Sequence, residues 1–507
     1  MVSMLPAKPF LDDIPAVAAN RRFLRATLVP GKLLAENPLL RLFRLTVFGI
    51  VLGGALLAAA TSTVRYIRHA EVQPILEELA EHLPLELRAL PDTLADAPWS
   101  AWISDLDSNI RARLARGDEE SIVNWLLLGT SFTSQPRAVI DASALKDRQT
   151  AVGLGNLMSA RADDLMRALA SPGDDERRLF ARRFLESNGF TVTTAVGIAE
   201  THDHLLGAVL RIAAEREGFT QELEAARQSG DAEAEIARRA RLFHARGLSL
   251  ETSLAPNYAL EQSLAAMKMR GLLKAGVVKR VAIVGAGLDF AGEETGFDFY
   301  PLQTIQPFAV LDSLRRLRLA PAAGNPEIVV LDISPRIIDH ITRIHEQAAR
   351  GIGYMMHVPL ARNVDWLPEF RQYWKQFGDR IGAAVAAPAP NAPAELADDR
   401  VIRIPASVAR LVSVENLNIV TERIDKQPFD LIIATNVLVY YELLEQSLAM
   451  SNLQAMLKPG GFLLSNSVLP ELESLVIEPA DVLTTAYTRA NDGDRIVWYQ
   501  RSDGVLK

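Results

Sequence analysis

The C-terminal half of the sequence predicts an α/β fold with a mostly parallel sheet, helices on both faces and a terminal antiparallel hairpin. From residue 281 onward, short apolar runs alternate with helical patterns, which is typical of strand-helix-strand units. Several runs end in polar residues, and the first leads into a glycine turn. Near the C-terminus, Val482–Thr488 and Arg495–Gln500 flank Asn491-Asp492-Gly493, a hairpin signal. We therefore expect a ligand site where the carboxyl ends of the parallel strands meet.

Length and composition indicate a globular protein of two or three domains. The 507 residues are 49% hydrophobic and 23% charged. A net charge of −8 offers no basic face for nucleic acid. The absence of cysteine excludes disulfides, thiolate catalysis and cysteine-ligated metal centres. His202-Asp203-His204 lacks a third ligand at a telling spacing, so we expect no metal site.

One segment near the N-terminus has the character of a membrane span. Residues 45–64 contain no charge, and 20 helical residues can cross a hydrocarbon layer of roughly 30 Å. Two alternatives are a buried core helix and a signal peptide cleaved near Ala58-Ala59-Ala60. A single transmembrane helix is the favoured interpretation. The basic residues of the flank 1–44 are then expected to contact anionic lipid.

The part between the anchor and the sheet, residues 65–270, is expected to be an α-helical domain. Ile75, Leu76, Leu79 and Leu83 form one apolar face at helical spacing. The region shows no catalytic constellation, and residues 271–507 are expected to form the domain that carries the site. Within it, we interpret His340 and His345 as surface residues, because they lie five apart on a predicted helix.

Two strand ends in this domain carry candidate binding residues. Gly285-Ala286-Gly287 follows an apolar strand, and glycines allow a ligand to approach the backbone closely. Phe290 occupies the third position of the dinucleotide pattern, which needs a glycine there, so a pyrophosphate site is disfavoured. Asp332 ends the strand Ile328–Asp332, where a carboxylate can accept hydrogen bonds from ribose hydroxyls. The alternative is an exposed helix N-cap formed by Asp332 or Ser334.

A third strand end belongs to the cassette Phe429–Ser467. It consists of a buried strand ending at Thr435-Asn436, an amphipathic helix, a turn at Lys458–Gly461 and another buried strand. The cassette resembles the class I S-adenosylmethionine (SAM)-dependent methyltransferases. Its Asn436–Tyr441 phrase and its Leu-Lys-Pro-Gly-Gly turn look most like those of the chemotaxis-receptor glutamate methyltransferases. The resemblance covers about residues 270–505.

The resemblance implies a Rossmann-like sheet of seven strands, mostly parallel, with a terminal antiparallel hairpin that Rossmann dehydrogenases lack. It also implies SAM as the cofactor. Two tyrosines lie where the sulfonium and the acceptor would meet, so they are the candidate catalytic residues: Tyr440 and Tyr441. The implied cofactor-binding residues come from four segments of the chain: Gly285, Ala286, Gly287, Asp332, Ile333, Glu422, Asn436 and Val437. Glu422 is expected near the adenine, at the end of a third strand over Leu417–Thr421. The alternative role for the two tyrosines is core packing.

Methyl transfer is the leading functional hypothesis. The alternatives are a non-catalytic membrane-anchored scaffold with a degenerate methyltransferase fold and an NAD-dependent oxidoreductase. The methyl acceptor is not specified by the sequence. The resemblance suggests a carboxylate, whereas an anchor and an aromatic segment at 366–377 would suit a lipid or a small apolar molecule. We expect that segment to be a mobile cover over the acceptor pocket, because it interrupts the series of cofactor strands.

The orientation of the anchor rests on two opposing observations. Basic residues precede residues 45–64 and acidic residues follow soon after, which places the N-terminus in the cytoplasm and the remainder outside. SAM, however, is a cytoplasmic metabolite. We therefore expect a single-pass membrane protein whose catalytic domain faces the cytoplasm.

Overall fold

A computed structural model describes residues 64–88, 96–138, 148–228, 248, 252–289, 297–322, 324–386, 397–425 and 427–502. From Val64 onward these residues belong to one compact unit. The flank 1–44 and the predicted membrane segment 45–64 lie outside the described residues, except for Val64, which begins strand β1 (Val64–Tyr66). Across the described ranges, no helix combines the length and the apolar character needed to cross a bilayer.

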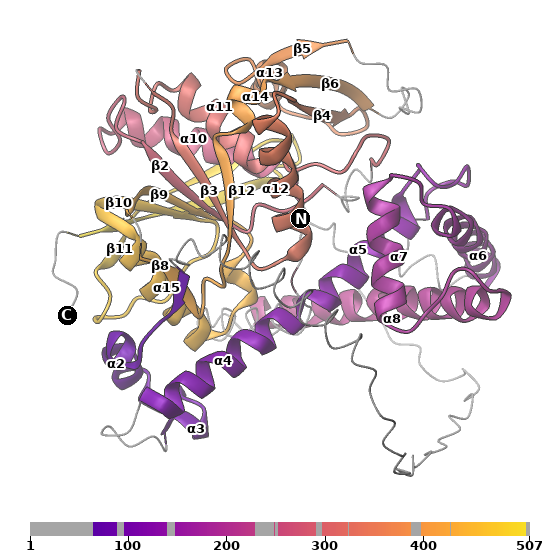
Figure 1. Cartoon of the computed structure of the whole chain (residues 1–507), viewed down its shortest axis with the longest axis horizontal. Helices are drawn as coiled ribbons and strands as arrows, with labels where there is room; N and C mark the ends of the chain where they lie inside the picture. The colour runs from indigo at the N-terminus through magenta and orange to yellow at the C-terminus, as the bar shows by residue number, and fades with distance from the viewer. Residues whose placement is uncertain are drawn as a thin grey trace, which may run out of the picture. The chain divides into compact units, whose positions relative to one another are not determined.

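Helices fill the described residues that precede the large sheet (Figure 1). In chain order they are α2 (His69–Glu78), α3 (Leu85–Arg88), α4 (Asp96–Ala112), α5 (Leu114–Leu128), α6 (Arg148–Ala170), α7 (Glu176–Ser187), α8 (Ala195–Gln228) and α10 (Ala255–Met269). Helices α5, α6, α7 and α8 pack against one another, and α10 packs on the sheet. The helical character predicted from the apolar spacing is therefore present.

The large sheet has seven strands, of which six run in the same direction and one, β12, is reversed. In chain order they are β2 (Arg280–Val284), β3 (Glu327–Asp332), β7 (Val412–Asn416), β9 (Phe429–Ala434), β10 (Leu457–Ser465), β11 (Ile477–Ala486) and β12 (Gly493–Arg501). Numbered one to seven, they lie in the spatial order 3-2-1-4-5-7-6. β12 runs antiparallel to both β10 and β11. The predicted Rossmann-like sheet with a terminal antiparallel hairpin is confirmed, and its strand order reverses between β2 and β9.

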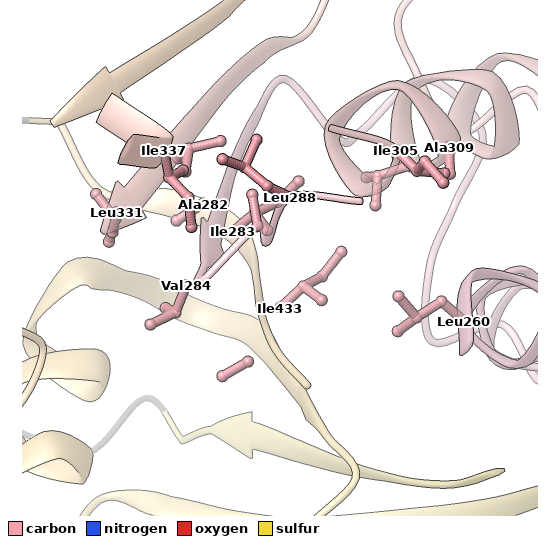
Figure 2. Close-up of a cluster of buried hydrophobic side chains, with 14 of the residues drawn as sticks. Leu260, Ala282, Ile283, Val284, Leu288, Ile305, Ala309, Leu331, Ile337 and Ile433 are labelled. Atoms are coloured by element: carbon pink, nitrogen blue, oxygen red, sulfur yellow. The ribbon is translucent and has the colours of Figure 1, made fainter. Parts of the chain in front are cut away.

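The core of the domain lies between this sheet and the helices that connect its strands. These are α11 (Gln306–Arg316), α12 (Pro335–Ala349), α14 (Ala406–Ala409) and α15 (Leu443–Met456). Figure 2 shows Ile283 of β2 and Ile433 of β9 in one cluster with Leu260 of α10. All five residues of β2 are buried, as expected of a strand covered on both faces.

A small antiparallel sheet is inserted between α12 and β7. Its strands β4 (Tyr354–Ala361), β5 (Ala383–Val385) and β6 (Ala397–Ile404) lie in the order β4-β6-β5, with α13 (Pro368–Gln376) beside them (Figure 1). The aromatic residues of α13 face inward: Phe370 and Tyr373 are buried and lie 5.4 and 5.2 Å from the Tyr258 ring of α10. The segment predicted as a cover over the acceptor pocket thus contributes its aromatic side chains to the hydrophobic core.

The predicted third strand is wrong. Strand β7 ends at Asn416, and residues 417–421 form a turn in which the Val420 N–H donates to Asn418 Oδ1 at 3.1 Å. Glu422 begins strand β8 (Glu422–Ile424), which pairs with β1. In β7 apolar and polar residues alternate, because this strand lies at the edge of the sheet. The apolar run that follows it is buried, but it forms a turn. Apolar residues therefore did not mark the strand here.

His340 also differs from the prediction, because it is buried. One ring nitrogen lies 3.3 Å from the Glu176 carboxylate of α7, and the other lies 3.2 Å from the Tyr354 hydroxyl of β4. The helix face that carries His340 is covered by elements from distant parts of the chain, which spacing within the helix cannot reveal.

Candidate active site

A cavity of about 390 Å³ lies at the carboxyl edge of the parallel strands, where the strand order reverses. Residues at the ends of β7, β3, β2 and β9 line it: Leu417, Ile419, Asp332, Ile333, Gly285, Ala286, Gly287, Thr435, Asn436 and Val437. The lining also includes Tyr440 and Tyr441, which follow β9, and Tyr487 and Asp494 of the terminal hairpin. Leu248 and Ser253, which precede α10, and Asn257 in its first turn complete this part of the wall. Its size and its position suit a nucleoside-sized ligand.

The glycine turn after β2 forms the floor at the switch point. Gly285 and Gly287 have φ angles of 67° and 70°, a conformation that residues with a side chain rarely adopt. A Cβ atom at Gly285 would lie 2.5 Å from a methyl carbon of Val437. Both glycines are therefore required by the backbone, and they leave the main chain open toward the cavity.

Asp332 is the buried acid of the cavity, with 5% of its surface exposed. Its Oδ1 accepts a hydrogen bond of 2.8 Å from the Ser334 N–H. Its Oδ2 is buried and has no hydrogen-bond partner among the described residues. Burial raises the pKa of Asp332 to about 7, against the opposing effect of the backbone N–H groups of Ser334, Ile333 and Ala286. The exposed-cap alternative does not describe this carboxylate, because the N-cap residue of α12 is Ser334.

The cassette that follows β9 supplies the next part of the wall. Asn436 has a φ of 58°, and its N–H donates to Asn466 Oδ1 at 2.8 Å. Tyr440 is half-buried, whereas Tyr441 is buried and lies 5.8 Å from the Arg113 guanidinium. Both tyrosines line the cavity, but only Tyr440 is partly open to solvent. Burial raises the pKa of Tyr441, so its hydroxyl stays protonated at neutral pH.

Glu422, which was predicted to lie near the adenine, does not line the cavity. Its carboxylate accepts hydrogen bonds from the Asn418 N–H at 2.8 Å and from Arg111 at 3.1 Å. The turn before it instead brings Leu417 and Ile419 to the cavity, whose lining also includes Ile333. These three side chains are apolar, which suits contact with a planar base.

Several lining residues were missed by the sequence interpretation: Leu248, Ser253, Asn257, Gln306, Leu417, Ile419, Tyr487 and Asp494. Gln306 donates from Nε2 to Thr435 Oγ1 at 2.9 Å and so ties α11 to the end of β9. Thr435 lies at the strand end where the sequence places it, directly before Asn436. Tyr487 and Asp494 had a signal as well, since an antiparallel hairpin returns its turn to the carboxyl edge.

A comparison with protein families identifies the class of enzyme. The family model described as "CheR methyltransferase, SAM binding domain" matches residues 394–472, which include β9, the Asn436–Tyr441 phrase and β10. The chain carries a class I SAM-dependent methyltransferase. The predicted resemblance to chemotaxis-receptor methyltransferases is thus confirmed, and SAM is the cofactor of this methyltransferase.

Solved structures of methyltransferases resemble the chain at low scores, and no curated protein sequence matches it. The N-methyltransferase NodS from Bradyrhizobium japonicum WM9 is 14% identical, with 48% of this chain and 97% of that chain covered and a TM-score of 0.24. Magnesium protoporphyrin IX methyltransferase (ChlM) from Synechocystis PCC 6803 is 11% identical, with coverages of 49% and 81% and a TM-score of 0.23. These similarities are too low to support any conclusion beyond the one that the family match gives.

The residues of the cavity fit SAM. The orphaned Oδ2 of Asp332 can accept a hydrogen bond from a ribose hydroxyl, and Ile333, Leu417 and Ile419 can enclose the adenine. The glycine turn leaves room for the methionine part beside the backbone. Strands of a sheet lie about 4.8 Å apart, so the edge from β7 to β12 spans about 24 Å. A ligand seated over β7, β3, β2 and β9 leaves the β12 end open.

Proposed function

We propose that the methyltransferase binds SAM across β7, β3 and β2, and that the methyl acceptor enters at the β12 end of the cavity. The observation that supports this most directly is the buried Asp332 oxygen without a partner at the switch point of the sheet. Because this oxygen faces the cavity where ligands of such sheets bind, a hydrogen-bond donor of the ligand is the partner we expect for it. When bound, SAM supplies a methyl group on a positively charged sulfur.

In this proposal the chain aligns the two reactants and keeps water out. Asp332 and Ile333 fix the nucleoside, the turn Gly285–Gly287 fixes the methionine part, and Asn436 and Val437 lie beside the reacting atoms. Tyr440 is half-buried at the open side of the cavity, where it can contact the acceptor. Tyr441 is better suited to support the wall, because it is buried against Arg113.

Calorimetry of the full chain with adenosylhomocysteine and with NAD tests the proposal. We expect adenosylhomocysteine to bind and NAD not to bind. Asp332→Ala should weaken adenosylhomocysteine binding by roughly 2–4 kcal/mol, because the ribose loses hydrogen bonds to a charged group. Asp339→Ala serves as the matched control, because this exposed aspartate lies on the following helix outside the cavity.

The two results that contradict the proposal point to different alternatives. Binding of NAD would favour an oxidoreductase. Failure to bind either ligand by a folded chain would favour a scaffold with a degenerate methyltransferase fold. Equal binding by the Asp332→Ala variant and the parent would show that the carboxylate does not hold the ribose.

A further inference from the structure

The β12 end of the cavity is shaped by the direction of the last two strands. β12 runs antiparallel to the parallel strands, so its first residues lie at the edge where those strands end. This brings Asp494 of β12 and Tyr487, which follows β11, to the cavity. Tyr487 is held there by Trp366 and Phe370, whose rings lie 6.3 and 5.9 Å away. The β12 end of the cavity therefore carries the Asp494 carboxylate and an aromatic side chain, Tyr487.

A second group at this end comes from α10, which packs on β11 and β12. Asn257 lies in the first turn of this helix, lines the cavity and has only 2% of its surface exposed. Its Nδ2 donates to the Ser253 carbonyl at 2.8 Å, and this bond fixes which side of the amide carries the oxygen. Its Oδ1 is buried and has no hydrogen-bond partner among the described residues. The amide thus presents an unsatisfied acceptor.

The charge of the cavity has one sign. Its described lining contains the carboxylates of Asp332 and Asp494 but no lysine, arginine or histidine. The guanidinium of Arg113, which lies behind the Tyr441 ring, is 3.7 Å from the Glu445 carboxylate. An anionic acceptor would therefore approach a carboxylate without a cation in the described wall to offset the repulsion. This feature disfavours the carboxylate acceptor that the resemblance suggests.

We propose that the acceptor of this methyltransferase is an amine, held by Asp494 and by the Asn257 amide oxygen. The inference rests on the proposed function, because it assigns the substrate class of the same cavity. An amine offers N–H donors, and the two groups at this end offer acceptors. A carboxylate has about four lone-pair sites, so Asp494 can accept from the amine in addition to the contacts it already makes.

Methyl transfer from SAM to an amine balances in atoms and charge with these groups alone. The lone pair of a neutral amine nitrogen forms the new bond to the methyl carbon. The carbon–sulfur bond breaks, and its electron pair stays on sulfur, which becomes neutral. The nitrogen takes up the positive charge, and one of its protons passes to the Asp494 carboxylate and then to solvent. The products are a methylated amine, adenosylhomocysteine and one proton.

A pair of probes of the same shape tests the inference on the full chain saturated with adenosylhomocysteine. Benzylamine, which is a cation at neutral pH, is compared with phenylacetate, an anion, by titration calorimetry. We expect benzylamine to bind at least about tenfold more tightly than phenylacetate. Asp494→Asn should remove this preference and leave the affinity for adenosylhomocysteine unchanged. Glu478→Gln removes one charge from the exposed part of the same hairpin, and it should keep the preference.

The outcomes separate the inference from the proposed function. If adenosylhomocysteine binds but phenylacetate binds as tightly as benzylamine, or neither probe binds, the amine assignment fails alone. A preference that persists in Asp494→Asn also overturns it. Loss of adenosylhomocysteine affinity in Asp494→Asn would assign this carboxylate to the cofactor instead. If the parent chain does not bind adenosylhomocysteine, both proposals fail together.

Discussion

At the scale of single residues, the protonation of Asp332 should control cofactor binding. Burial raises the pKa of this carboxyl from 3.8 to about 7, so it is largely neutral below pH 7 without ligand. Ribose hydroxyls donate to the charged form more strongly. The affinity for adenosylhomocysteine should therefore rise by up to about tenfold per pH unit between pH 5 and 7, and level off above about pH 8. Asp332→Asn should show a flat profile, and a flat profile in the parent would contradict the assignment.

The same titration has an opposite effect on the stability of the unliganded chain. Between about pH 4 and 7 the folded state binds more protons at Asp332 than the unfolded state does. Its contribution is thus fully present below about pH 4 and is lost as pH rises through 7. Denaturant titrations should show that the free energy of unfolding of the parent chain decreases over this pH range when adenosylhomocysteine is absent. The decrease should not appear with adenosylhomocysteine bound, nor in the Asp332→Asn variant.

Substitutions of Gly287 should weaken cofactor binding in proportion to the size and branching of the new side chain. Its φ of 70° is costly for any side chain and more so for a β-branched one. Gly287→Ala should weaken adenosylhomocysteine binding by about tenfold, and Gly287→Val should weaken it further. Gly153→Ala is the control, because a Cβ there meets nothing within 4 Å. If both Gly287 variants bind as the parent does, the turn does not approach the ligand.

At the scale of elements, the packing of α13 decides whether this helix is a mobile cover over the cavity or part of the hydrophobic core. Its Phe370 ring packs at 4.7 Å on Trp366 and at 5.4 Å on Tyr258 of α10. We expect Phe370→Ala to lower the free energy of unfolding by about 3–5 kcal/mol, since it leaves a cavity in the core. Lys375→Ala on the same helix should have little effect. Hydrogen exchange should find α13 protected equally with and without adenosylhomocysteine, whereas a gain of protection on binding would restore the cover hypothesis.

The edge strand β7 illustrates why one element was misassigned. Val412–Asn416 alternates apolar and polar residues because one side of an edge strand is only partly covered. The following apolar run, 417–420, resembled a central strand more closely. It is buried because it closes a turn whose residues contact the helices before the sheet: Asn418 Nδ2 donates to Asp107 of α4 at 2.8 Å. The sequence pattern alone cannot distinguish a buried apolar turn from a buried strand that hydrogen-bonds to its neighbours in a sheet.

At the scale of the whole molecule, buried polar contacts join the early helices to the segment between β2 and α11. Asp298 accepts hydrogen bonds from Trp125 Nε1 at 2.7 Å and from the N–H groups of Thr130 and Ser131 at 2.7 and 3.0 Å. Burial would raise the pKa of Asp298, but the hydrogen bonds from Ser131, Thr130 and Trp125 outweigh it and lower the pKa. The charged form is therefore the one that stabilises the contact.

Asp298→Ala should lower the free energy of unfolding by about 3 kcal/mol, because it leaves buried donors without partners. The contribution of Asp298 is present above its unfolded pKa and should be lost as pH falls through its lower folded value. Asp174→Ala, which alters an exposed aspartate, is the control. Chemical denaturation of the full chain measures both. An unchanged midpoint for Asp298→Ala would mean that the helices and the sheet do not depend on this contact.

The membrane anchor remains a prediction at this scale. We propose that residues 45–64 cross the bilayer once and that the catalytic part faces the cytoplasm, where SAM is available. A fusion of green fluorescent protein after Lys507 should fluoresce, and a fusion of alkaline phosphatase there should be inactive. Active phosphatase would place the methyltransferase outside and favour the scaffold alternative.

The sequence by itself determined the class of sheet and the cofactor. Strands β2, β3 and β9 are continuous apolar runs whose polar ends mark the site, and the hairpin signal at Asn491–Gly493 marks β11 and β12. These features are local, because a strand covered on both faces and a tight turn each constrain their own residues. Nine of the ten site residues that these strand ends and the family resemblance predicted line one cavity.

Only the tertiary structure decided what faces the two ends of that cavity. Leu417 and Ile419 replaced Glu422 at the β7 end because Glu422 is held by Arg111 of α4, more than 300 positions earlier in the chain. Asn257 and Asp494 both line the cavity because α10 packs on β12, the antiparallel strand Gly493–Arg501. Spacing within one segment carries no information about such contacts, since they depend on which distant surfaces the fold brings together.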